Sequence, residues 1–96
     1  MKSSNEQTLK QAIQELLDAY KLNDGIRESR VIHSWERIAG PYVAKNTESL
    51  FIRNKTLYVK LNSPALKNEL SFARSKLIES LNKEVNAIVI HEIVFL

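Results

Sequence analysis

Apolar residues recur at helical spacing near the start of the chain. They form one continuous stripe, spaced i, i+3, i+4, i+7, i+8 and i+11, made of Leu9, Ala12, Ile13, Leu16, Leu17 and Tyr20. This spacing predicts an amphipathic helix over about residues 5–22. Ser3 with Glu6, or Ser4 with Gln7, offers a capping box at its start. The tripeptide Asn23-Asp24-Gly25 is expected to end the helix, because glycine readily adopts a left-handed conformation.

Two further helices are indicated by shorter stripes. Val31, Trp35 and Ile38 predict a helix over about residues 27–39, and Trp35 is expected to be a core anchor. Gly40 is a typical terminator, and Pro41 suits the start of a short helical turn over 41–45. The third stripe is Leu66, Leu70, Ala73, Leu77 and Leu81. Ser63 should cap this third helix with Pro64 at its first position, and the helix should end near residues 82–86.

The middle of the chain changes to alternation. If Asn54-Lys55 forms a two-residue turn, strands over about 48–53 and 56–61 pair as a hairpin with Phe51 opposite Tyr58. One face should join a core with Trp35, and its expected members are Leu50, Ile52, Leu57, Val59, Leu70 and Leu77. The other face sets the two aromatic rings between Arg53 and Lys60.

A last strand is predicted over residues 87–96, and both of its faces are apolar. Ile88, Ile90 and Val94 would lie on one face, and Val89, Ile93 and Phe95 on the other. This pattern suits a central strand, a covered sheet or a subunit contact. The order helix, helix, strand, strand, helix, strand predicts a two-layer α+β fold, in which helices cover one face of a three-stranded mixed sheet.

Composition limits the classes of function. The 96 residues suit a single domain over 1–96, with residues 1–4 expected to be flexible. The absence of cysteine excludes disulfides, zinc fingers and thiol nucleophiles. There is no apolar run of about 20 residues and no signal core, so we expect a soluble cytoplasmic protein. The net charge of +3 permits contact with nucleic acid.

Enzyme signatures are missing from the sequence. It contains no P-loop, dinucleotide fingerprint, G-x-S-x-G or H-E-x-x-H motif. The two histidines, His33 and His91, do not make a metal site alone. We therefore expect no catalytic residue, no metal and no cofactor.

Two groups of residues are candidates for binding. Exposed aromatic rings can stack on nucleic-acid bases. Alternatively, Phe51 and Tyr58 form a cross-strand pair that stabilises the hairpin by about 0.2–1 kcal/mol, or a partner or the first helix covers them. The candidate nucleic-acid-binding residues are Phe51, Arg53, Tyr58, Lys60, Lys67 and Arg74, the last two on one side of the third helix. Candidate contacts for phosphates or an acidic partner are Arg27, Arg30 and Arg37, close to His33.

An ordered set of short motifs resembles the DciA family of bacterial replicative-helicase loaders. These motifs are Trp35-x-x-Ile38-Ala39-Gly40, Val43-Ala44, Asn46-Thr47, Ser63-Pro64, Glu69-Leu70 and Leu81-Asn82. The resemblance implies a domain similar to the K-homology fold that binds the DnaB-type helicase and, weakly and without sequence preference, single-stranded DNA. It also implies a non-enzymatic role in helicase loading during DNA replication.

The sequence departs from the family at several positions. Asn46 replaces a frequent histidine, Lys55 a frequent turn glycine, and Leu66 lies near a frequent tryptophan. The G-x-x-G loop with which K-homology domains clamp a nucleic-acid backbone is missing, so any contact with a strand must come from side chains.

The end of the sequence adds one further expectation. Many relatives carry a long basic tail, whereas this sequence ends at Leu96. We expect a short, tail-less member in which the adaptor role has more weight. The alternative functions are a general single-stranded RNA- or DNA-binding module and a pure protein-interaction adaptor.

Overall fold

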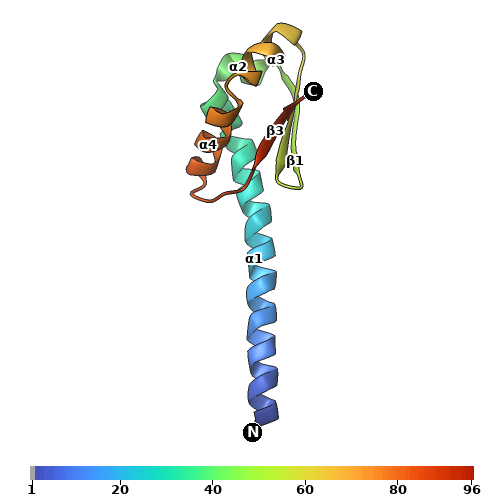
Figure 1. Cartoon of the computed structure of the whole chain (residues 1–96), viewed down its shortest axis with the longest axis vertical. Coiled ribbons are helices and arrows are strands. Elements are labelled where there is room, and N and C mark those ends of the chain that lie inside the picture. Colours follow the sequence, from blue (N-terminus) through green and yellow to red (C-terminus); the bar gives the residue numbers. More distant parts are fainter. Residues whose placement is uncertain (1) are drawn as a thin grey trace.

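A long helix projects from a small head that contains the remaining elements (Figure 1). The computed structural model describes the backbone of residues 2–96 and the side chains of residues 8–19 and 23–96. In chain order the elements are α1 (Lys2–Ala39), α2 (Pro41–Lys45), β1 (Thr47–Arg53), β2 (Thr56–Leu61), α3 (Pro64–Ser71), α4 (Arg74–Glu84) and β3 (Glu92–Phe95). We call residues 2–26 of α1 the arm and residues 27–96 the head. The molecule measures 66 × 20 × 19 Å.

The arm and the first part of the head form one helix, so the predicted break at residues 23–25 is wrong. Gly25 lies inside α1 and is not among the residues with positive φ. A glycine inside a helix costs only about 1 kcal/mol relative to alanine, which the neighbouring turns can offset. An ion pair between Arg27 and Asp24, at 4.0 Å, spans the position. The predicted capping boxes and the expected flexibility of residues 1–4 fall outside the described side chains, as does Tyr20.

Gly40 ends α1 as predicted. Its φ of 97° is a conformation that side chains with a Cβ rarely adopt. Pro41 is the first residue of α2. Proline suits this position because an N–H group in the first turn of a helix has no intrahelical acceptor, so its absence costs no hydrogen bond.

The hairpin has the predicted register. Phe51 pairs with Tyr58, and Asn54 and Lys55 form the two-residue turn. Their φ values of 51° and 59° are typical of a type I′ turn, whose twist matches that of the flanking strands. A β-bulge between Thr47 and Ser49 interrupts the pairing at the far end.

The third predicted helix is divided into α3 and α4. Ser63 caps α3 as predicted, since its side chain accepts a hydrogen bond from the N–H of Leu66. The helix ends at Ser71 because the next two N–H groups bond three residues back, Phe72 to Glu69 and Ala73 to Leu70, at 3.3 and 3.0 Å. The predicted stripe nevertheless faces the core on both sides of the break.

The last strand is shorter than predicted and covers only β3. The side chain of Asn82 takes up the backbone of the preceding segment: its Oδ1 accepts from the N–H groups of Val89 and Ile90, at 2.9 and 3.0 Å, and its Nδ2 donates to the Ile90 carbonyl at 2.8 Å. The N–H groups of Val89 and Ile90 and the Ile90 carbonyl are therefore bonded to Asn82 and do not pair with a neighbouring strand. Val89 and Ile90 are both buried and Ile88 is exposed, so the predicted alternation of faces is also wrong there.

The sheet has the order β1-β2-β3, with an antiparallel hairpin and a parallel pair between β2 and β3. The central strand is thus β2, and β3 lies at an edge. Helices α2 and α4 lie on one side of the sheet with α1, which leaves its other face open (Figure 1). This is the predicted α+β architecture; its likeness to a K-homology domain stays a prediction.

The core lies between this sheet and the helices. The predicted members Trp35, Leu57, Val59 and Leu77 are buried, and Leu50, Ile52 and Leu70 are partly buried against them. The remaining buried apolar residues include Val31, Leu81, Ile90 and Ile93.

Candidate nucleic-acid and partner interfaces

The open face of the sheet carries the predicted aromatic pair. The rings of Phe51 and Tyr58 are stacked, with centroids 4.9 Å apart and planes inclined by 13°. Phe51 is 41% exposed and Tyr58 is half-buried. Arg53 and Lys60 are exposed and, by the alternation of the paired strands, share this face. The structure therefore brings together four of the six candidate nucleic-acid-binding residues.

Strand order makes the two rings unequal. Tyr58 lies on the central strand between Phe51 on β1 and Val94 on β3. Phe51 lies on an edge strand, so one face of its ring meets Tyr58 while the opposite face points away from the sheet. A base is flat and apolar on both faces and can stack on such a ring. The geometry thus favours Phe51 over Tyr58 as the stacking surface.

The cations on this face are not equivalent either. Lys60 Nζ lies 3.8 Å from Glu48 Oε2, and both side chains are about half exposed. Glu48 is the residue at the bulge between Thr47 and Ser49. Exposed pairs of this kind contribute at most about 1 kcal/mol, so a phosphate can displace the carboxylate.

Lys67 and Arg74 do not share one helix side, contrary to prediction, because the break at Phe72 puts them on α3 and α4. Arg74 lies close to β3. Its Nε lies 3.8 Å from Glu92 Oε1, and its guanidinium carbon lies 6.0 Å from the centre of the Phe95 ring. Lys67 is exposed on α3. Neither residue lies on the strands that carry the aromatic pair.

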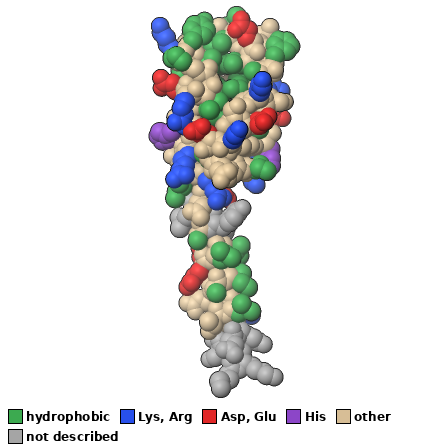
Figure 2. Space-filling model, turned by 90° about the vertical axis from the view of Figure 1, so that its left-hand side faces the viewer, with side chains coloured by type: hydrophobic (Ala, Val, Ile, Leu, Met, Phe, Trp, Pro, Cys, Tyr) green, Lys and Arg blue, Asp and Glu red, His purple; other side chains and the backbone are tan. Residues whose placement is uncertain are grey.

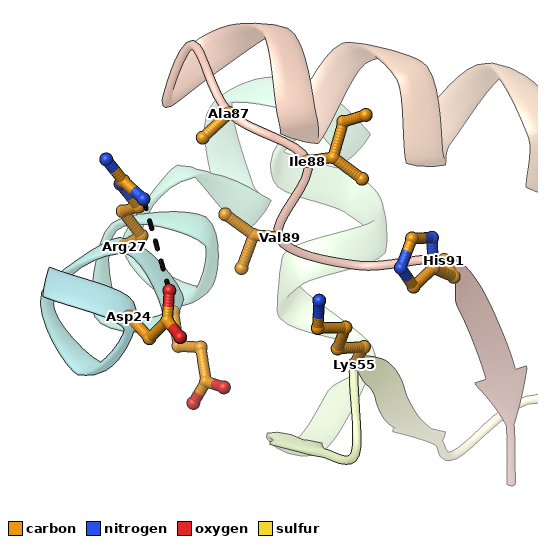
Figure 3. A pocket seen from close by; sticks show the side chains of 8 residues that line it. Asp24, Arg27, Lys55, Ala87, Ile88, Val89 and His91 are labelled. Carbon is orange, nitrogen blue, oxygen red and sulfur yellow. Dashed lines mark ion pairs between the residues drawn. The ribbon is translucent and has the colours of Figure 1, made fainter. Parts of the chain in front are cut away.

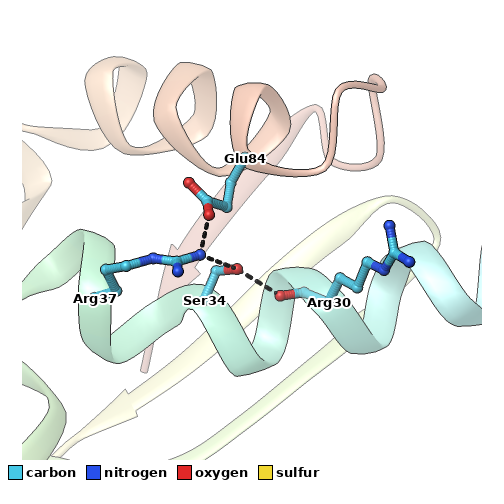
Figure 4. Close-up of polar contacts among 4 residues, drawn as sticks. All are labelled: Arg30, Ser34, Arg37 and Glu84. Atoms are coloured by element: carbon cyan, nitrogen blue, oxygen red, sulfur yellow. Dashed lines mark hydrogen bonds and ion pairs between the residues drawn. The ribbon is translucent and has the colours of Figure 1, made fainter.

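A second basic region lies where α1 packs against α4. A shallow hollow of about 330 Å³ is lined by Arg30, His33, Ser34, Arg37, Glu84 and Val85. Arg37 donates to Glu84 across the two helices and, at 3.5 Å, to the Ser34 hydroxyl (Figure 4). The Ser34 hydroxyl in turn donates to the Arg30 carbonyl at 2.8 Å. An incoming phosphate would compete with Glu84 for Arg37, whereas the Arg30 guanidinium points away from this contact (Figure 4).

Arg27 does not line the hollow that Arg30 and Arg37 share. It lines a different cavity of about 400 Å³ between α1, the hairpin turn and the segment after α4 (Figure 3). The other lining residues are Asp24, Glu28, Lys55, Ala87, Ile88, Val89 and His91. Sequence reasoning missed this cavity because it assigned residues 87–91 to a strand. Its walls mix both signs of charge, so it favours neither an anion nor a cation.

The described residues form neither a metal site nor a membrane span. No group of three or more His, Cys, Asp or Glu side chains is placed to hold a metal ion. None of the helices in that part of the chain combines the length and apolar character that a membrane span needs.

Comparison with known proteins identifies the family. No curated protein matched the chain. The family model described as "Dna[CI] antecedent, DciA" matches residues 8–95, which include most of the arm and all but the last residue of the head. DciA proteins are helicase-loading accessory proteins of bacterial DNA replication and are not a known enzyme family. Since the match covers nearly the whole sequence, the chain belongs to the DciA family and, with it, to the accessory proteins of replicative-helicase loading.

Proposed function

We propose that this protein binds both the DnaB-type replicative helicase and single-stranded DNA in the cytoplasm, and that it helps to place the helicase on DNA without hydrolysing nucleotide. Family membership supports the helicase contact. The observation that supports the DNA contact is the stacked pair of Phe51 and Tyr58 on the open sheet face, with Arg53 and Lys60 beside it.

The chemistry of this face favours weak binding without sequence preference. A ring stacks on any base, and cations attract any phosphate. The face is built from side chains on strands, and the chain has only two glycines, neither in the hairpin. Affinity therefore rests on one free ring face and a few charges.

A second candidate is a pure protein-interaction adaptor. Two observations favour it: the rings of Phe51 and Tyr58 already cover one face of each other, and Lys60 already has Glu48 as a partner. In that case the pair contributes to the stability of the hairpin alone.

Titration of a fluorescent single-stranded oligonucleotide over a series of salt concentrations separates these candidates. With three or four phosphates neutralised, log affinity should fall against log salt with a slope of about −2 to −3. Phe51→Ala should cost about 1–3 kcal/mol of binding through lost stacking, with little change in slope. Tyr58→Ala should cost less, because Tyr58 lies between its neighbours. Lys60→Ala should reduce the slope by about 0.7.

Phe72→Ala is the matched control. Phe72 is 86% exposed, but it lies between α3 and α4 and off the sheet face, so its loss should leave DNA affinity unchanged. If Phe51→Ala keeps full affinity while the melting temperature falls, the adaptor is the correct candidate.

A further inference from the structure

Strand β1 has a neighbouring strand on one side only. It lies at the edge of the sheet, and β2 is the central strand. On β2, Val59 and Leu61 turn their backbone groups towards β3: the Leu96 N–H donates to the Val59 carbonyl at 2.8 Å, and the Leu61 N–H donates to the Leu96 carbonyl at 3.3 Å. Since successive residues of a strand turn these groups to alternate sides, Tyr58 and Lys60 bond to β1.

The same alternation applies to β1. The β1 partners of those two residues are Phe51 and Ser49, whose backbone groups are therefore used within the hairpin. The N–H and C=O groups of Leu50 and Ile52 point the other way, out of the sheet. In the described part of the chain, no backbone group outside the hairpin bonds to them. Strand β1 thus presents a free edge with which another extended strand can pair.

The middle of β1 lacks the features that protect many edge strands. Natural edge strands often carry proline, lysine or a bulge. The bulge of β1 lies at its start, between Thr47 and Ser49, and its only cation is Arg53 at its end. Between them Leu50 and Ile52 face the core and are only partly buried, whereas their partners on β2 are fully buried. The hydrophobic core is therefore open along this edge.

We propose that β1 of a second copy of this chain pairs with this edge, antiparallel, and that the two sheets become one six-stranded sheet. The two-fold axis passes between the two copies of Phe51. Leu50 of each copy then lies opposite Ile52 of the other, and the two pairs exchange four backbone hydrogen bonds. Both pairs are aliphatic and lie on the core face. On the open face, Phe51 stacks on Phe51 of the second copy and extends the existing stack with Tyr58.

Charge complementarity favours a second copy in this register. Arg53 of one copy comes opposite Ser49 of the other, and Glu48 lies beside Ser49 in the bulge. The Glu48 carboxylate reaches the open face, because it lies 3.8 Å from Lys60, which is on that face. Arg53 has no ion pair in the described structure of the single chain. In the dimer its guanidinium can bond to Glu48 of the second copy, and the contact forms twice.

Other arrangements of two β1 strands lose these matches. Shifting the register by two residues in one direction sets Ile52 opposite Glu48, and shifting it in the other sets Phe51 opposite Arg53. Parallel strands would bring Arg53 beside Arg53 and Glu48 beside Glu48, with like charges together. A strand from a different protein would need its own matching order of aliphatic, aromatic and charged residues. Strand β1 itself supplies that order, which is why we assign the edge to a second copy.

A second copy and a nucleic-acid base use the same side of the Phe51 ring. Pairing of the two β1 strands covers the ring face that Tyr58 leaves open. One consequence rests on the proposed function: single-stranded DNA binds the monomer, and self-pairing lowers the amount of chain that is available to it.

The arm is a different exposed apolar surface. Figure 2 shows hydrophobic side chains gathered along one side of its described part, and Leu9, Ile13, Leu16 and Leu17 are 50–69% exposed. Association through the arm would not respond to a change of charge on β1. The variants that test the pairing of the sheets therefore lie on β1.

Sedimentation velocity of the full chain over a concentration series tests the pairing, with neither DNA nor helicase present, so the result is independent of the proposed function. The unmodified chain should show a reversible monomer–dimer equilibrium below about 1 mM, because so small an interface is weak. Arg53→Glu should weaken dimerisation by about tenfold, since it sets a carboxylate beside Glu48 at both ends of the interface. Adding Glu48→Arg to this variant restores opposite charges and should bring the dissociation constant back to within about threefold.

Lys76→Glu is the matched control. It makes the same change of charge on α4, where Lys76 is exposed, and should leave the dissociation constant within about twofold. Far-UV circular dichroism should show unchanged secondary structure for every variant, because all of the substituted side chains are exposed.

Disulfide trapping tests the register, because the chain has no cysteine of its own. Ser49→Cys and Arg53→Cys chains, mixed in equal amounts, should form the mixed disulfide in clear excess over either homodimer. Positions 49 and 53 meet across the interface, whereas the two copies of position 49 lie about 13 Å apart along the strands, too far for a disulfide.

The proposal is overturned if the unmodified chain stays monomeric at every concentration, or if Arg53→Glu dimerises as tightly as the unmodified chain, which would place the association elsewhere, such as on the arm. It is also overturned if Glu48→Arg does not restore the dimer of the Arg53→Glu chain, or if the disulfides form in statistical proportions.

Discussion

Trp35 joins the main helix to the sheet. Its ring is only 3% exposed, and its Nε1–H donates to the Thr47 hydroxyl at 3.1 Å. The Thr47 hydroxyl donates in turn to the Val43 carbonyl at 2.7 Å. A core position was predictable from Val31 and Ile38, which lie four residues before and three after it. The hydrogen bond was not predictable, because it joins α1 to the start of β1 through tertiary packing.

Trp35→Phe should lower the free energy of unfolding by about 1–3 kcal/mol, since it removes one hydrogen bond and leaves unfilled volume in the core. Urea unfolding followed by far-UV circular dichroism measures this, as the substitution removes the only tryptophan. Tyr42→Phe, at an exposed position, is the control and should change stability by less than about 0.5 kcal/mol. Equal effects of the two substitutions would contradict the role given to Trp35.

Local signals predicted the elements whose contacts are local. The alternation around Asn54-Lys55 was sufficient for the hairpin and its register, and Ser63-Pro64 for the start of α3. The predictions were wrong where other groups in the chain, neighbouring or distant, determine the local structure. Gly25 stays helical because the turns on either side of it are helical and offset its low helix propensity. Residues 87–91 do not join the sheet, because the Asn82 side chain bonds to the backbone of this segment. No periodicity in the sequence indicates this contact.

Gly25→Ala distinguishes a continuous α1 from a broken one by the sign of its effect. A Cβ added at Gly25 meets nothing within 4 Å. In a continuous helix, alanine should increase helicity and stabilise the chain by up to about 1 kcal/mol. At a helix end with left-handed glycine, the same change would destabilise it. Thermal unfolding by circular dichroism, with Gly40→Ala as the destabilising counterpart at φ 97°, gives the sign.

Asn82→Ala should cost about 2–3 kcal/mol of folding free energy, because it removes three hydrogen bonds and leaves backbone groups at Val89 and Ile90 without partners. Chemical unfolding of the variant checks this value. Asn86→Ala is not a suitable comparison, since Asn86 has a φ of 55°; the exposed Asn68→Ala is a better control. A loss as small as that of the control would show that the segment does not depend on this side chain.

The whole molecule divides into a head that completes its own core and an arm that does not. This division could not be predicted from the sequence. An apolar stripe indicates that one face of a helix packs against another apolar surface, but it does not indicate which surface that is. The candidate site shows the same limit. Register alone brought Phe51, Tyr58, Arg53 and Lys60 together, as these contacts lie within one hairpin. The pairs Arg74–Glu92 and Arg37–Glu84 required the packing of α4 against β3 and α1.

We propose that this accessory protein of helicase loading contacts the replicative helicase itself. Size-exclusion chromatography of the chain with the DnaB-type helicase of the same host, with and without single-stranded DNA, tests it most directly. At about micromolar concentrations the two proteins should elute together, the amount of helicase on DNA should rise when the chain is present, and the chain alone should hydrolyse no ATP. Separate elution under both conditions, or ATP turnover by the chain alone, would show that the protein does not act as a helicase-binding, non-hydrolysing accessory.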